Sequence, residues 1–115
     1  MATVAVSVRE QRMDALAAAN EIRLGIARVR AEVFALEQPA GCEEVAGLLE
    51  NPDETVSAMK IGTLLLSVRK FGRQRVGRLL SMAEVRSMDR RVRDLSERQR
   101  RVLAGLLRDR ARVVS

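Results

Sequence analysis

The chain has 115 residues, 47% of them hydrophobic, and contains no His, Trp or Tyr. This length predicts a single domain, 1–115, and the apolar fraction predicts a small aliphatic core that folds without metals or disulfides. With no histidine and one cysteine, Cys42, the chain lacks the residues for a Cys/His metal cluster or a histidine-activated nucleophile. We therefore expect no enzymatic activity, no cofactor and no metal. The apolar runs are too short to span a membrane and no signal peptide is evident, so we expect a cytoplasmic protein. Cys42 is expected to be a small buried hydrophobic residue.

The net charge of +6 is unevenly distributed along the chain. Residues 1–58 carry 5 basic and 10 acidic residues, whereas residues 59–115 carry 16 basic and 5 acidic residues. Lys60 and Lys70 are the lysines, and the other cations are arginines, which bind phosphate oxygens bidentately. An acidic half followed by a basic half is typical of proteins that bind a polyanion through one region, here the C-terminal half.

The spacing of apolar residues predicts helices and no strands, so the fold class is all-α. Residues 8–37 form one long helix with two neighbouring apolar stripes, ending before Pro39. After a loop marked by Pro39 and Gly41, residues 42–50 form a short helix with two carboxylates in its first turn. Asp53 then caps a further turn.

The C-terminal half continues with short helices joined by basic segments. Residues 60–68 form an apolar helix with Leu64, Leu65 and Val68 in the core. A turn follows in which Gly72 takes a positive φ angle. Residues 73–82 form the next helix, with Val76, Leu79 and Leu80 inward and Arg75 and Arg78 outward. Residues 96–99 form a capping box that opens a last helix, in which Val102, Leu103, Leu106 and Leu107 are buried and from which residues 109–115 fray.

The first candidate binding segment is the basic turn at Lys70, Gly72, Arg73 and Arg75. Free backbone N–H groups at the start of a helix, with cations in the same turn, can hold a phosphodiester without reading sequence. The alternative is a solvated charged turn between two core helices.

The second candidate segment contains Arg90, Arg91 and Arg93, in a stretch without its own helical apolar face. Such a segment can lie along a groove of DNA and reach both phosphates and the minor-groove floor. The alternative is pairing of these arginines with the flanking Asp89 and Asp94.

The two aromatic residues, Phe34 and Phe71, indicate which nucleic acid such a surface would bind. Proteins that bind single strands stack bases on exposed aromatic rings, and we expect the core to use both phenylalanines. The methionines 59, 82 and 88 are likewise expected to fill gaps in the core. Duplex binding through the backbone, with weak sequence preference, is therefore favoured.

Four short stretches, in order along the chain, resemble the actinobacterial (mycobacterial-type) integration host factor family. They are residues 10–12 (Glu-Gln-Arg, followed by Ala15-Leu16), 59–65 (Met-Lys-Ile-Gly-Thr-Leu-Leu), 70–75 (Lys-Phe-Gly-Arg-Gln-Arg) and 90–95 (Arg-Arg-Val-Arg-Asp-Leu). The chain has Arg69 where the family has a helix-breaking residue and Asp94 where it has glycine.

The resemblance implies a nucleoid-associated protein in which a long N-terminal helix packs on a helix-two-turns-helix module, here residues 40–108. Proteins of this family bind duplex DNA with little sequence specificity, bend or compact it, and can assist a phage integrase in recombination. Carried over by position, the phosphate-binding turn would contain Lys70, Gly72, Arg73 and Arg75, and the arginine cluster would contain Arg90, Arg91 and Arg93.

A second interpretation makes the chain a non-enzymatic interaction module. The acidic first half and the long helix would then dock a partner or dimerise, and the basic half would bind RNA or an acidic protein surface. The oligomeric state follows from neither interpretation.

Overall fold

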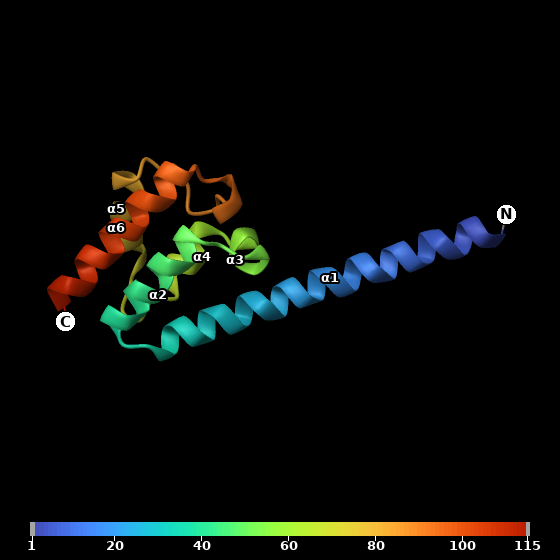
Figure 1. Ribbon diagram of the computed structural model, residues 1–115, viewed down its shortest axis with the longest axis horizontal. Coiled ribbons are helices and arrows are strands. Elements are labelled where there is room, and N and C mark those ends of the chain that lie inside the picture. Colours follow the sequence, from blue (N-terminus) through green and yellow to red (C-terminus); the bar gives the residue numbers. More distant parts are fainter. Residues whose placement is uncertain (1, 115) are drawn as a thin grey trace.

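The computed structural model describes the backbone of residues 2–114 and the side chains of residues 11–114. Within this part all regular secondary structure is helical, which confirms the all-α fold class. The elements are α1 (Ala2–Ala35), α2 (Gln38–Glu50), α3 (Glu54–Ala58), α4 (Ile61–Leu66), α5 (Arg73–Met82), the 3₁₀ turn η1 (Val92–Asp94) and α6 (Glu97–Val114) (Figure 1). The side chain of Glu10, from the predicted Glu-Gln-Arg motif, and residue 115, from the predicted frayed tail, lie outside the described part.

Helix α1 is packed against the body at its C-terminal end and projects beyond it at the other (Figure 1). Val33 is buried, and Ile26 and Val29 pack against the core. Gly25 lies so close to Thr55 of α3 that a Cβ there would meet its hydroxyl at 2.9 Å. Residues 11–21 are all exposed, so the molecule is 64 Å long but only 28 by 23 Å across.

The centre of the core lies between α2 and α6. Cys42 and Leu49 of α2 and Leu103 and Leu107 of α6 have no exposed surface. The expected burial of Cys42 is confirmed. The predicted start of this helix at residue 42 is wrong, because Pro39 occupies the first turn of α2, where its missing N–H costs no hydrogen bond.

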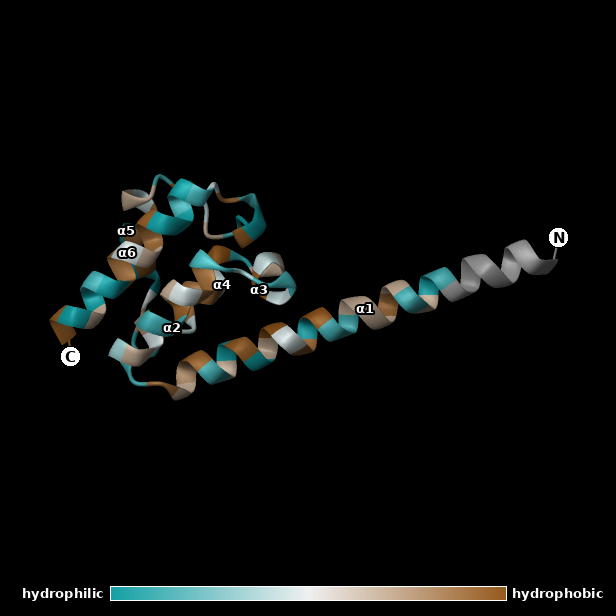
Figure 2. Cartoon of the chain, viewed as in Figure 1, coloured by the Kyte–Doolittle hydropathy of each residue, from teal (hydrophilic) through white to brown (hydrophobic). Residues whose placement is uncertain are grey.

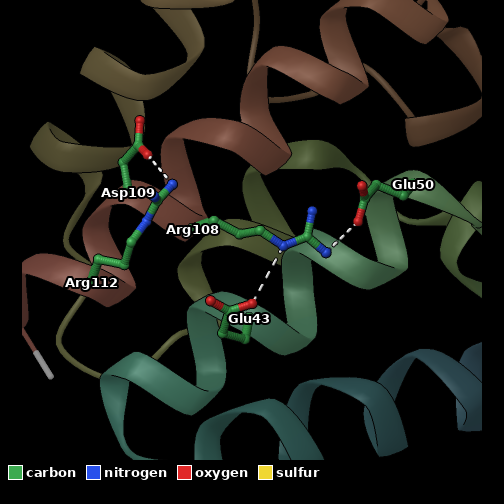
Figure 3. Close-up of polar contacts among 5 residues, drawn as sticks. All are labelled: Glu43, Glu50, Arg108, Asp109 and Arg112. Carbon is green, nitrogen blue, oxygen red and sulfur yellow. Dashed lines mark hydrogen bonds and ion pairs between the residues drawn. The ribbon is translucent and has the colours of Figure 1, made fainter.

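The prediction that the chain frays from residue 109 is also wrong, since α6 continues to Val114. Ala111 is buried, which extends the apolar face of α6 by one turn beyond Leu107. Arg108 forms ion pairs with Glu43 and Glu50 of α2, and Arg112 pairs with Asp109 (Figure 3). Tertiary contacts of α6 with α2 therefore keep the last turns helical.

Several local predictions are confirmed by hydrogen bonds. Ser96 and Gln99 form the capping box, in which the Ser96 N–H donates to Oε1 of Gln99 (2.9 Å) and the Gln99 N–H donates to Oγ of Ser96 (3.0 Å). Asp53 caps α3 by accepting from the Val56 N–H at 2.8 Å. Helix α5 has the predicted bounds.

Two side chains expected in the core are exposed. Phe34 is 57% exposed and Met82 is 63% exposed. Phe34 lies in the last turn of α1 and points about 100° around the helix from the buried Val33, and the guanidinium of Arg69 lies over its ring, 5.2 Å from its centre. Met82 ends α5 beside α6 without being enclosed.

The ion pair between α6 and α2 predicts a pH dependence of stability. A hydrogen bond from Arg108 lowers the pKa of the Glu50 carboxyl below its ordinary value. Because the pKa is lower in the folded state, the stabilisation is present above the ordinary carboxyl pKa and is lost as the pH falls through the folded one. We expect Glu50→Gln to lower the urea midpoint by more at about pH 7 than at about pH 3. An equal loss at both pH values would contradict this.

Candidate nucleic-acid interface

The arginine segment is fixed by backbone hydrogen bonds to the beginning of α4. The N–H groups of Ile61 and Gly62 donate to the carbonyl oxygens of Arg90 (2.7 Å) and Met88 (2.9 Å). In the other direction, the Val92 N–H donates to the Met59 carbonyl at 2.9 Å. A segment without a helical apolar face thus has a defined backbone.

Gly62 makes this close approach possible. A Cβ at this position would lie 2.6 Å from the Cβ of Met88 and 2.9 Å from its carbonyl oxygen. These distances are shorter than any normal contact, so a larger residue at position 62 would push the arginine segment away from α4.

The three arginines of the segment are exposed but differ in their contacts. Arg91 donates a hydrogen bond from Nη1 to the Ala58 carbonyl, and Arg90 donates from Nη2 to the Asp94 carbonyl at 2.9 Å. Arg93 has no hydrogen-bond or ion-pair partner among the described residues. Arg90 and Arg91 therefore also stabilise the fold locally, although each guanidinium keeps further N–H donors for a phosphate.

The flanking carboxylates do not neutralise this segment. Asp89 forms its ion pair with Lys60 at 3.6 Å, and both side chains are largely exposed. In the described part of the chain, neither Asp89 nor Asp94 forms an ion pair with Arg90, Arg91 or Arg93. The alternative of self-pairing within the segment is thus not observed.

The basic turn is formed differently from the prediction. Gly72 has a φ of −95°, whereas Lys70 has a φ of 67°, so the left-handed residue is Lys70. This reversal ends the turn after α4 and brings Phe71 into the core, where it is 7% exposed. Gly72 instead precedes the first turn of α5, with no atom within 4 Å of where a Cβ would be, so the N-terminus of α5 is open to solvent.

The structure separates two of the predicted residues of this turn. Arg73 lines a hollow of about 290 Å³ together with Lys60, Met88 and Asp89, next to the arginine segment. Arg75 lies two residues further along α5 and lines a different hollow, with its guanidinium 5.4 Å from the centre of the Phe71 ring. Residues two apart on a helix point in nearly opposite directions, so Arg75 does not belong to the same surface as Arg73.

Site prediction from sequence omitted Lys60, which lies beside the arginine segment, and the buried Gly62, which positions that segment. Lys60 lies in the same hollow as Arg73 and pairs across an isolated antiparallel bridge with Arg91. The position of Lys60 as the first residue of the predicted apolar helix 60–68 was the available signal. The approach of Gly62 to Met88 had no such signal, because it joins residues far apart in the sequence.

We name this surface the α4–arginine surface and define it as Lys60, Arg73, Arg90, Arg91 and Arg93. Lys70 and Gly72, just before Arg73, are also exposed. Among residues 2–114, no helix has the length and apolar character needed to cross a bilayer, and no cluster of three or more His, Cys, Asp or Glu side chains could hold a metal ion. No family model, curated protein or solved structure matches the chain.

Substitution of Gly62 tests the contact that positions the arginine segment. We expect Gly62→Ala to destabilise the protein by about 1–3 kcal/mol, because the added methyl overlaps Met88. Gly77→Ala is the matched control, since Gly77 lies inside α5 with no atom within 4 Å of a Cβ. It should stabilise the protein by about 0.5–1 kcal/mol. Urea denaturation measures both effects, and a neutral Gly62→Ala would contradict the proposed packing.

Proposed function

We propose that this protein is a non-enzymatic DNA-binding protein that holds duplex DNA through phosphate contacts with little sequence preference. The observation that carries the proposal is the hydrogen-bonded attachment of the arginine segment to α4. It holds exposed cations on an ordered backbone beside Lys60 and Arg73, and the nearby carboxylate of Asp89 is already paired with Lys60. An ordered cationic surface binds phosphates without the entropic cost of first arranging the chain.

The chemistry of the surface favours duplex DNA as the ligand. Its side chains are arginines and one lysine, which contact phosphates or enter a narrow minor groove. Neither aromatic ring belongs to the α4–arginine surface, because Phe71 is buried and Phe34, although 57% exposed, lies at the end of α1 with the Arg69 guanidinium over its ring. Asparagine and glutamine, which would read base edges, are not part of the α4–arginine surface.

In this proposal the protein acts in the nucleoid of the cytoplasm, as the resemblance to the actinobacterial integration host factor family implies. Its contacts would bend or compact DNA, and a site-specific integrase is a candidate partner during recombination. Of the residues that the resemblance suggested, we retain Lys70, Gly72, Arg73, Arg90, Arg91 and Arg93 in the proposed interface and leave out Arg75, which lines a different hollow.

Removing two unpaired arginines tests the interface without disturbing the fold. Arg73 and Arg93 are exposed and have no hydrogen-bond or ion-pair partner in the described part of the chain. We expect the Arg73→Ala, Arg93→Ala double variant to bind a random-sequence duplex more weakly, with the slope of log K against log salt reduced by about 2. Fluorescence anisotropy across a salt series measures the slope.

Arg12→Ala is the matched control, because Arg12 is an exposed arginine on the projecting part of α1. It should leave both affinity and slope unchanged, and all three proteins should have the same melting temperature. Unchanged DNA binding by the double variant would show that the interface lies elsewhere, and no binding by the unsubstituted protein at low salt would exclude the proposed function.

A competition experiment tests the preference for duplex over single strand. Because the α4–arginine surface contains no aromatic ring for base stacking, we expect a matched single strand to displace labelled duplex less effectively than unlabelled duplex does. Equal or stronger competition by the single strand would refute the duplex assignment while leaving phosphate binding intact.

A further inference from the structure

The side of α5 opposite the α4–arginine surface forms a second hollow, which the proposed function does not use. We name it the α5–α6 hollow. It has a volume of about 400 Å³, with Leu79, Met82 and Leu106 as its apolar lining. Leu79 and Leu106 are half-buried and Met82 is 63% exposed, so apolar surface is open to solvent here.

Three arginines surround this apolar lining: Arg75, Arg78 and Arg110. Arg75 lies over the Phe71 ring, and Arg110 makes a long hydrogen bond of 3.4 Å to the side-chain oxygen of Gln38. No carboxylate lines the hollow, and none of the three forms an ion pair with a described residue. The hollow therefore suits an apolar surface that carries negative charge.

A surface of that kind lies on the projecting part of α1. Met13 and Leu16 are 64% and 69% exposed, and Ala17 and Asn20 continue the stripe in the exposed region. The helix side opposite, from Ile22 onward, is the one that faces the body of its own chain. Figure 2 shows hydrophobic and hydrophilic residues together along this unpacked part of α1.

Carboxylates accompany the stripe on one flank. Asp14 and Glu21 are two helical turns apart, so they lie on the same side of α1. Both are exposed and neither forms an ion pair within the described side chains. Arg12 and Arg23 lie on the other flank of the stripe, so the negative charge is confined to the Asp14–Glu21 flank.

We propose that residues 13–21 of α1 dock into the α5–α6 hollow of a second copy of this chain. Both surfaces occur on one polypeptide, and they complement each other in apolar character and, along the Asp14–Glu21 flank, in charge. The two surfaces cannot meet within one chain, because α1 projects away from α5 and α6 (Figure 1). A contact between two different surfaces produces either a reciprocal pair or a chain of copies. A phosphate backbone is a poorer occupant of the hollow, since it makes no apolar contact with Leu79, Met82 and Leu106.

The test is a charge reversal on each side of the contact, without nucleic acid, so its outcome is independent of the proposed DNA binding. We expect the unsubstituted protein to self-associate in sedimentation velocity experiments, more weakly at high salt. Glu21→Arg and Arg78→Glu should each weaken association by about tenfold or more, because each places like charges together. An equal mixture of the two variants should restore association, since residue 21 of each variant then meets the opposite charge at residue 78 of the other.

Two exposed residues away from both surfaces provide controls, and Glu44→Arg and Arg86→Glu should leave association unchanged. Circular dichroism checks that every variant is folded. A single-chain mass for the unsubstituted protein at all concentrations would overturn the proposal, leaving the hollow to another partner. Association that Arg78→Glu leaves intact would also overturn it and would indicate pairing of α1 with α1. Failure of the mixture to restore association would overturn it as well.

Discussion

The burial of α2 against α6 is the interaction on which the rest of the structure depends. The two helices make the largest contact between elements and contribute Leu49, Leu103 and Leu107, which have no exposed surface. Polar contacts reinforce the edges of this packing, because Arg100 donates to the Leu49 carbonyl at 2.9 Å and Arg108 pairs with Glu50. With one aromatic ring buried, the core is filled almost entirely by aliphatic side chains, and it holds α4 and α5 in fixed positions.

The apolar helix α4 connects this core with the proposed DNA-binding surface. Its inner side buries Leu64 and Leu65, while its first backbone N–H groups bind the carbonyl oxygens of Met88 and Arg90. The core therefore determines where the arginine segment lies. It also aligns α5 so that Arg73 and Arg75 serve different surfaces, which separates the proposed DNA contacts from the proposed contact between copies.

These two proposals have a common physical basis in the uneven charge of the chain. The acidic first half supplies Asp14 and Glu21 on a helix that has no body contacts there, and the basic second half supplies arginines on both sides of α5. A protein that binds DNA on one side of α5 and a second copy on the other could hold two stretches of duplex together. Compaction would then follow from association of copies as well as from local bending.

The sequence by itself determined the local features of this protein. The helical class, the bounds of α5, the Asp53 cap and the Ser96–Gln99 capping box depend on residues a few positions apart, which local physical chemistry controls. Only the tertiary structure decided the length of α6, the exposure of Phe34 and Met82, the left-handed conformation of Lys70 rather than Gly72, and the separation of Arg73 from Arg75. Each of these depends on which distant segment packs nearby, as when Gly62 admits Met88, and the spacing of residues along one chain carries no information about that contact.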